Sequence, residues 1–164
     1  MSLKAITLAG VAALVLSTAG VEAQGLVARR DLSLAMAQTM AKAALAECRA
    51  KGYHTALAVV DRAGEPMVLL RDEEATAQNL EMARRKAYTA RMFRVSTLDF
   101  AKRTADDPIR QPQREIPQLL ALGGGVPVMV GKDTIGGVGS AGSTQPQDDA
   151  CAKAGVAAVA DQLK

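Results

Sequence analysis

His54 is the only histidine in the 164-residue chain, and it directly follows Tyr53. Histidine and tyrosine both ligate haem iron, so this pair is a candidate source of an iron ligand. A strand is predicted to begin here, and alternation along it would point the two side chains to opposite faces. A single histidine excludes a His-rich metal site and catalysis by a Ser-His or Cys-His pair. The alternative is an ordinary solvent-facing histidine at the start of a strand.

A basic segment follows later in the chain, with Asp99 as its only acidic residue. Such a segment suits carboxylates or phosphates. Lys86 could pair with a ligand carboxylate or, if desolvated, act as a base, with Asp61 as a further candidate base. A solvated helix face is the alternative. Nucleic acid is not expected, because two Phe, two Tyr and no Trp leave little for base stacking. The basic residues are Arg84, Arg85, Lys86, Arg91, Arg94, Lys102 and Arg103.

Residues 123–142 contain eight of the fourteen glycines and read as a β-hairpin. Glycine is needed where φ is positive, or where another backbone or a flat ligand approaches closely. Residues 137–142 match G-x-G-x-x-G, but a single helix follows them, which excludes the βαβ unit of a dinucleotide site. The hairpin is therefore either a ligand wall or a close-packing surface. In the first case, the amides of Gly124 and Gly125 are candidate anion donors.

The predicted elements that position these residues follow the order α-β-β-α-α-β-β-α. Asp31 is predicted to cap the first helix, Ser96 the third, and Thr144 the last through a capping box with Gln147. The proline-rich stretch at 104–117 is predicted to be a surface loop. Four strands in two hairpins favour an α+β domain with a mostly antiparallel sheet. The helices are expected to begin near residues 31, 76, 96 and 144, and the strands at 55–60, 66–70, 126–130 and 134–139.

The first residues have the pattern of a secretory signal peptide. Lys4 precedes an apolar run, and small residues lead to Gln24. We expect cleavage after residue 23, a mature domain at 24–164, and a periplasmic or secreted protein without stable membrane insertion after cleavage. In an oxidising compartment, Cys48 and Cys151 could form a disulfide if the first and last helices pack together. Two separately buried thiols are the alternative.

Six motifs in this order resemble the GlcG/HbpS family of haem-binding proteins. They are AVVDRAG at 58–64, LRD at 70–72, KAYTA at 86–90, GGVPV at 124–128, IGGVGSAG at 135–142 and QDDACA at 147–152. The resemblance implies a profilin-like α+β fold, an antiparallel sheet flanked by helices, and homo-oligomers. It also implies a binding role, since some members bind haem and some act with sensor systems.

Three functions follow as hypotheses. The first is an exported haem- or tetrapyrrole-binding protein, with the porphyrin against the glycine hairpin and its propionates near the basic helix. The second is an enzyme or binding protein for a small carboxylic or sugar acid. The third is a structural accessory oligomer. The candidate haem-site residues are Tyr53, His54, Arg84, Arg85, Lys86, Gly124, Gly125 and Ser140, with Tyr53, His54 or water on the iron.

Overall fold

The computed structural model describes residues 25–164, and the predicted signal peptide at 1–23 lies outside the described residues. The described elements confirm the predicted order α-β-β-α-α-β-β-α and the α+β class, with two short 3-10 helices added. They are α1 (Leu34–Ala50), β1 (Ala56–Val60), β2 (Pro66–Arg71), α2 (Ala77–Phe93), α3 (Thr97–Ala105), η1 (Gln111–Glu115), β3 (Gly125–Val130), β4 (Asp133–Ala141), α4 (Gln145–Ala157) and η2 (Ala160–Gln162).

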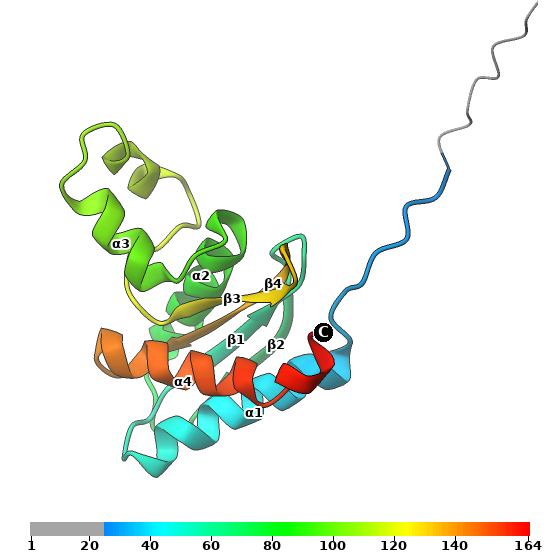
Figure 1. Ribbon diagram of the computed structural model, residues 1–164. Helices are drawn as coiled ribbons and strands as arrows, with labels where there is room; N and C mark the ends of the chain where they lie inside the picture. Colours follow the sequence, from blue (N-terminus) through cyan, green and yellow to red (C-terminus); the bar gives the residue numbers. More distant parts are fainter. Residues whose placement is uncertain (1–24) are drawn as a thin grey trace, which may run out of the picture.

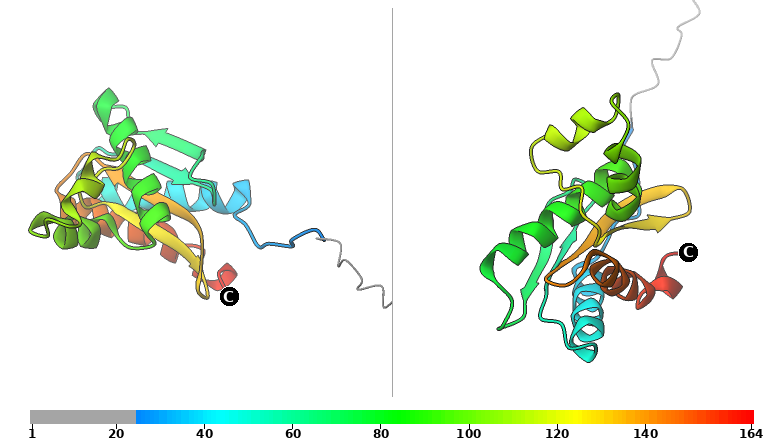
Figure 2. Two further views of the ribbon diagram at one scale, coloured as in Figure 1. Left: turned by 90° about the horizontal axis from the view of Figure 1, so that it is seen from above. Right: turned by 90° about the vertical axis from the view of Figure 1, so that its left-hand side faces the viewer.

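The four strands form one antiparallel sheet in the order β2-β1-β4-β3. Helices α1 and α4 lie side by side on one face of this sheet, and α2 covers the other face (Figure 1). A view from the side shows the same three layers, with α3 and η1 extending beyond the sheet (Figure 2, right). The two strands at the centre, β1 and β4, are therefore covered on both faces.

Two cores lie on the two faces of the sheet. On the side of α1 and α4, medium and large side chains such as Met40, Val59 and Val138 are fully buried. On the side of α2, the core contains small residues, and its members are Ala56, Ala58, Val60, Ala83, Ala87 and Ala141. Because these side chains are short, the axis of α2 can lie close to the sheet.

The glycines of the hairpin bring α2 closer still. A Cβ added at Gly139 would lie 2.0 Å from the carbonyl oxygen of Ala83, and one at Gly137 would lie 2.4 Å from that of Ala87. A Cβ at Gly125 would lie 2.2 Å from the carbonyl oxygen of Lys86. Close packing is thus confirmed for these three glycines, and the partner is the α2 backbone instead of a flat ligand or a second subunit.

Two of the three predicted helix caps differ from the structure. Ser33, not Asp31, is the N-cap of α1, and its hydroxyl accepts a bond from the amide of Met36. Asp31 instead accepts a bond from Arg62 at 2.5 Å. Thr144 is the N-cap of α4 but makes no side-chain cap bond, so the predicted capping box is wrong. Ser96 caps α3 as predicted.

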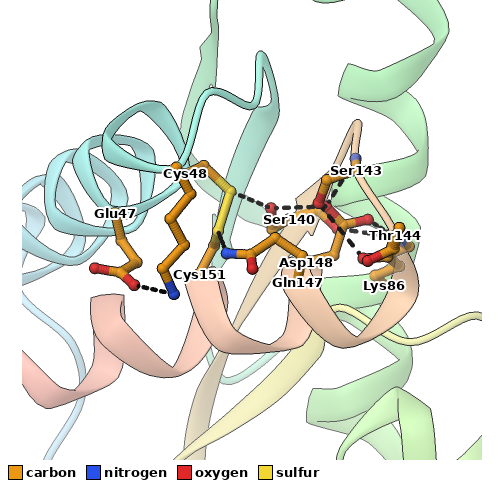
Figure 3. The surroundings of a disulfide bond; sticks show 10 residues. Glu47, Cys48, Lys86, Ser140, Ser143, Thr144, Gln147, Asp148 and Cys151 are labelled. Atoms are coloured by element: carbon orange, nitrogen blue, oxygen red, sulfur yellow. Dashed lines mark hydrogen bonds and ion pairs between the residues drawn. A yellow bond between two sulfur atoms is a disulfide. The ribbon is translucent and has the colours of Figure 1, made fainter.

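A disulfide joins α1 to α4, between Cys48 and Cys151 (Figure 3). The two Cα atoms lie 5.6 Å apart, although the residues are separated by 103 positions. Both residues are fully buried where the two helices pack against each other. The predicted pairing is therefore confirmed.

The proline-rich loop is exposed, as predicted, but one of its side chains anchors it. Arg114 on η1 donates to the hydroxyl of Thr104 at 2.9 Å and to the carbonyl of Ala101 at 2.6 Å, both on α3. The loop is thus tied back to the helix that precedes it. Among residues 25–164, none of the helices has the length and apolar character needed to cross a membrane.

Candidate functional site

A buried ion pair joins α2 to α4. The ammonium of Lys86 donates to Oδ2 of Asp148 at 2.8 Å and to the carbonyl of Ser140 at 2.9 Å (Figure 3). Each of the two charged side chains is 2% exposed. The pair therefore crosses the end of β4 between the helix layers on its two sides.

The second oxygen of Asp148 is held by serines. Its Oδ1 accepts from the amide and the hydroxyl of Ser143, at 3.2 and 2.7 Å, and from the hydroxyl of Ser140 at 3.3 Å. Asp148 also lies in the first turn of α4, where a carboxylate is favoured by the helix dipole. Both oxygens of this carboxylate are thus engaged by protein donors.

Burial lowers the pKa of Lys86, and the nearby Asp148 carboxylate opposes this effect. The lysine is therefore easier to deprotonate than an exposed lysine. Gly124 provides the space for the ammonium, because a Cβ added there would lie 2.9 Å from Nζ of Lys86 and 2.6 Å from the carbonyl oxygen of Ser140. Its φ of +123° also favours glycine.

A cavity of about 330 Å³ opens beside this pair. Hydroxyl, amide and charged groups from the start of α2, the end of β4 and the start of α4 line most of it. The lining residues are Thr76, Gln78, Asn79, Met82, Lys86, Leu122, Gly142, Ser143, Gln145 and Asp148. The cavity thus borders the buried ion pair at one end of the sheet.

His54 belongs to a second cluster. Its Nδ1 lies 3.0 Å from Oδ1 of buried Asp72, and its Nε2 lies 3.1 Å from the carboxylate of exposed Glu74. Arg49 donates to Oδ2 of Asp72 at 2.5 Å. This bond, with the amide of Glu74 and the His54 ring, lowers the pKa of Asp72 to about 2. Asp72 is therefore a carboxylate at neutral pH.

The structure brings together three of the eight predicted site residues, namely Lys86, Gly124 and Ser140. Gly125 does not join them, since its amide donates to the hydroxyl of Thr97 at 2.7 Å and is not available to an anion. Of the predicted pair of anion-donor amides, Gly125 is thus engaged within the protein and Gly124 stays a candidate.

The remaining basic candidates point elsewhere. Arg84 pairs with Glu81 at 2.8 Å, and Arg85 donates to the carbonyl of Leu119. Consecutive residues on a helix point in different directions, so Arg84, Arg85 and Lys86 do not form one anion site. Asp61, the other candidate base, accepts bonds from two amides of its own turn. Tyr53 lies beside His54 and is partly buried.

Sequence reasoning missed Asp148, the charged partner of Lys86, and Ser143, which donates to that carboxylate. One signal was present, because Lys86 has helical spacing with Ala83 and Ala90, which face the sheet. A lysine at such a position must find a buried partner. The identity of that partner depends on how α4 packs, which periodicity does not reveal.

A larger cavity, about 920 Å³, lies at the opposite end of α2. Part of the predicted basic segment contributes to it, through Arg91 and Arg94. Acidic side chains lie among the arginines, and Arg62 already binds Asp31. The charges in this cavity are thus mixed.

The fold and the ionic cluster define an α+β domain whose antiparallel sheet, covered by helices on both faces, carries a buried polar site at one end. The chain belongs to the HbpS-like family, because the family described as "Haem degrading protein HbpS-like" matches residues 32–157. The resemblance noted in the sequence is confirmed.

Solved structures agree with this assignment. HbpS of Streptomyces reticuli, in a double-mutant form, is 36% identical, with 87% of this chain and 97% of that chain covered and a TM-score of 0.77. PduOC, solved as a complex with heme, is 24% identical, with coverage of 79% and 95% and a TM-score of 0.70. At that identity, the second likeness concerns the fold alone.

A relative in Citrobacter freundii is described as an uncharacterized 15.0 kDa protein of the dhaT-dhaS intergenic region. It is 29% identical over 125 residues, which cover 71% of this chain and 84% of the relative. Its description names no ligand or activity, so the functional argument depends on the family and on the geometry.

Proposed function

We propose that this chain is an exported haem-binding protein in which His54 is the protein ligand to the iron. Membership of the HbpS-like family supports the choice of haem. The observation that carries the choice of ligand is the contact between Nδ1 of His54 and buried Asp72. When bound, haem supplies the iron centre for redox or oxygen chemistry.

Asp72 fixes which nitrogen of His54 can bind a metal. A carboxylate with a pKa of about 2 can only accept a hydrogen bond at neutral pH, so Nδ1 of His54 must be the donor. Nε2 likewise donates where it meets the Glu74 carboxylate, and once that contact is broken the neutral ring has its lone pair on Nε2. A carboxylate that orients a histidine in this way is the usual outer partner of a metal-binding imidazole, and it raises the basicity of the ligand.

The side of His54 that carries Nε2 is accessible. The ring is 47% exposed, and its contact there is Glu74, whose side chain is 70% exposed. An exposed glutamate can rotate away at little cost, whereas Asp72 is 2% exposed and fixed by Arg49. Iron can thus replace the outer carboxylate while the inner one continues to orient the ring.

Arg49 could also pair with a haem propionate, because its side chain is 47% exposed beside His54. This role replaces the one expected for Arg84 and Arg85. The 920 Å³ cavity is lined mostly by polar and charged groups, and the 330 Å³ cavity is small for a porphyrin, so we place the haem in neither. We therefore place the haem on the surface at His54 and propose that a second copy of the chain covers its outer face.

The test is a haem titration of the mature protein, followed through its Soret band. H54A should abolish or displace the band, whereas Y53F, the control at the neighbouring candidate ligand, should leave it unchanged. Loss of the band in Y53F with retention in H54A would transfer the ligand role to Tyr53. If both variants give the wild-type spectrum, neither residue binds the iron.

A further inference from the structure

We infer that the cavity beside Lys86 and Asp148 is a second binding site, separate from the proposed haem site, for a small monocarboxylate that also carries a hydroxyl or carbonyl group. The cavity volume of about 330 Å³ lies near the lower end of the range for ligand sites. An acid of a few carbon atoms fits such a space, and a porphyrin does not.

Lys86 provides the cation for the carboxylate. A lysine ammonium has three hydrogens, and two of them bond to Asp148 and to the carbonyl of Ser140. Lys86 also lines the cavity, and the two bonds described leave its third hydrogen for the oxygen of the proposed ligand. A bond of this kind is charge-assisted and strong when it is shielded from water.

The start of α4 provides a second attraction for an anion. Gln145, the first residue of this helix, lines the cavity, and the preceding Thr144 makes no side-chain cap bond. The amides of Gln145 and Gln147 are therefore not capped by that hydroxyl, whereas Pro146 between them has no amide hydrogen. The partial positive charge at a helix N-terminus then acts on the same oxygen that Lys86 binds.

Asp148 limits the charge of the ligand. Its carboxylate balances the ammonium of Lys86, so what remains is about half a positive charge from the helix end. A monoanion matches this balance better than a dianion such as phosphate. Further polar contacts are available from Asn79, Thr76 and Ser143, which line the same cavity and suit a hydroxyl or carbonyl group.

The buried ion pair between Lys86 and Asp148 is also costly if its only role is to stabilise the fold. Removing two charges from water costs several kcal/mol for each ion, and apolar replacements of buried pairs are often at least as stable. A buried pair that borders a polar cavity is better explained by a ligand that uses its free donor than by stability alone.

The experiment is isothermal titration of lactate into the mature protein, with lactamide as the matched neutral ligand and inorganic phosphate as the dianionic one. Lactate should bind, and lactamide and phosphate should bind at least about tenfold more weakly, the factor expected when one charge-assisted hydrogen bond is lost. Equal binding of lactate and lactamide, tighter binding of phosphate, or no binding of lactate would overturn the inference.

Substitutions in the cavity test whether lactate binds beside Lys86 and Asp148. K86M alone would leave Asp148 buried and unpaired, so the test variant is K86M/D148N, with its fold checked by circular dichroism and denaturation. This variant should lose lactate binding. K153M/D149N is the matched control, because Lys153 pairs with Asp149 on the same helix and the side chain of Asp149 is 6% exposed, and this variant should bind lactate normally.

H54A separates this inference from the proposed function. It should lose the Soret band and retain lactate binding. Retention of lactate affinity in a folded K86M/D148N protein would show that the acid binds elsewhere and would overturn the inference.

Discussion

Asp72 is a buried carboxylate that three separate groups hold in place. It accepts bonds from Arg49, from the amide of Glu74 and from the His54 ring. It is 2% exposed, so these three donors replace the water that the carboxylate loses on folding. The low pKa of Asp72 is the electrostatic consequence of this arrangement.

The free energy of unfolding should therefore depend on pH through Asp72. Its pKa falls from 3.8 to about 2 on folding, so the unfolded chain binds the proton more tightly. The stabilisation by Asp72 is complete above about pH 4 to 5 and is lost as the pH falls through about 4 toward 2. Urea denaturation of the wild type and D72N should show a difference that shrinks over this range.

E73Q is the control for that measurement. Glu73 also binds Arg49, but its side chain is 79% exposed and its contribution is screened by water. The pH dependence of E73Q should follow the wild type. A D72N protein with the wild-type slope between about pH 5 and about pH 2 would contradict the assignment.

Part of the candidate site could be predicted at the scale of single residues. His54 is conspicuous as the only histidine, and Lys86 lies on the sheet-facing spacing of its helix. Their partners Asp72 and Asp148 could not be predicted, because each lies in a different element and is brought near by packing. Arg84 and Arg85 were grouped with Lys86 by sequence proximity, and helical geometry separates them.

The packing of α2 on β4 depends on the absence of a side chain at Gly139. G139A would place a carbon 2.0 Å from the carbonyl of Ala83, and backbone on both sides leaves little room for adjustment. We expect a loss of about 3 kcal/mol or more in the free energy of unfolding, the upper end for overpacking. Chemical denaturation measures this directly.

G131A is the matched control, because Gly131 lies in the turn after β3 with no atom within 4 Å of an added Cβ. Its φ of +59° still disfavours alanine, so a loss of about 1–2 kcal/mol is expected there from backbone strain alone. Equal losses of unfolding free energy in G139A and G131A would mean that contact with α2 is not the reason for glycine at position 139.

The disulfide should contribute strongly to the pairing of α1 with α4. It links residues separated by 103 positions, and a crosslink that closes so long a loop restricts the unfolded chain. We expect C48S/C151S to lose roughly 2–5 kcal/mol of unfolding free energy. The wild type measured in reductant should show a similar loss. Equal midpoints for the oxidised and reduced wild type would contradict this expectation.

The elements themselves were largely predictable, because each strand and helix carries its own apolar pattern and turn residues. The residues that cap the helices were less predictable. Asp31 and Ser33 both suit an N-cap, and Arg62 on the distant β1–β2 turn engages Asp31. The sequence also did not show whether the hairpin glycines form a ligand wall or a close-packing surface. Only the position of α2 shows that a helix backbone fills the space they leave.

At the scale of the whole molecule, helices cover both faces of one sheet, and the His54–Asp72 and Lys86–Asp148 clusters lie near the same end of it. Gly142, which lines the Lys86 cavity, lies so close to His54 that an added Cβ would be 2.5 Å from the histidine carbonyl oxygen. The start of β1, the start of α2 and the start of α4 meet there. Predicting this meeting point requires the strand order β2-β1-β4-β3, which local patterns do not specify.

Export and the disulfide make one joint prediction for the complete chain. The apolar run before Gln24 predicts cleavage after residue 23, and transfer into an oxidising compartment would allow Cys48 and Cys151 to pair as they do in the structure. Intact mass spectrometry of the exported protein should therefore show a chain without residues 1–23, lighter by the two thiol hydrogens. The same mature chain, produced in a reducing cytosol and trapped with a thiol reagent, should retain both thiols. An exported protein that keeps its first residues would contradict the signal, and one with two free thiols would contradict the pairing.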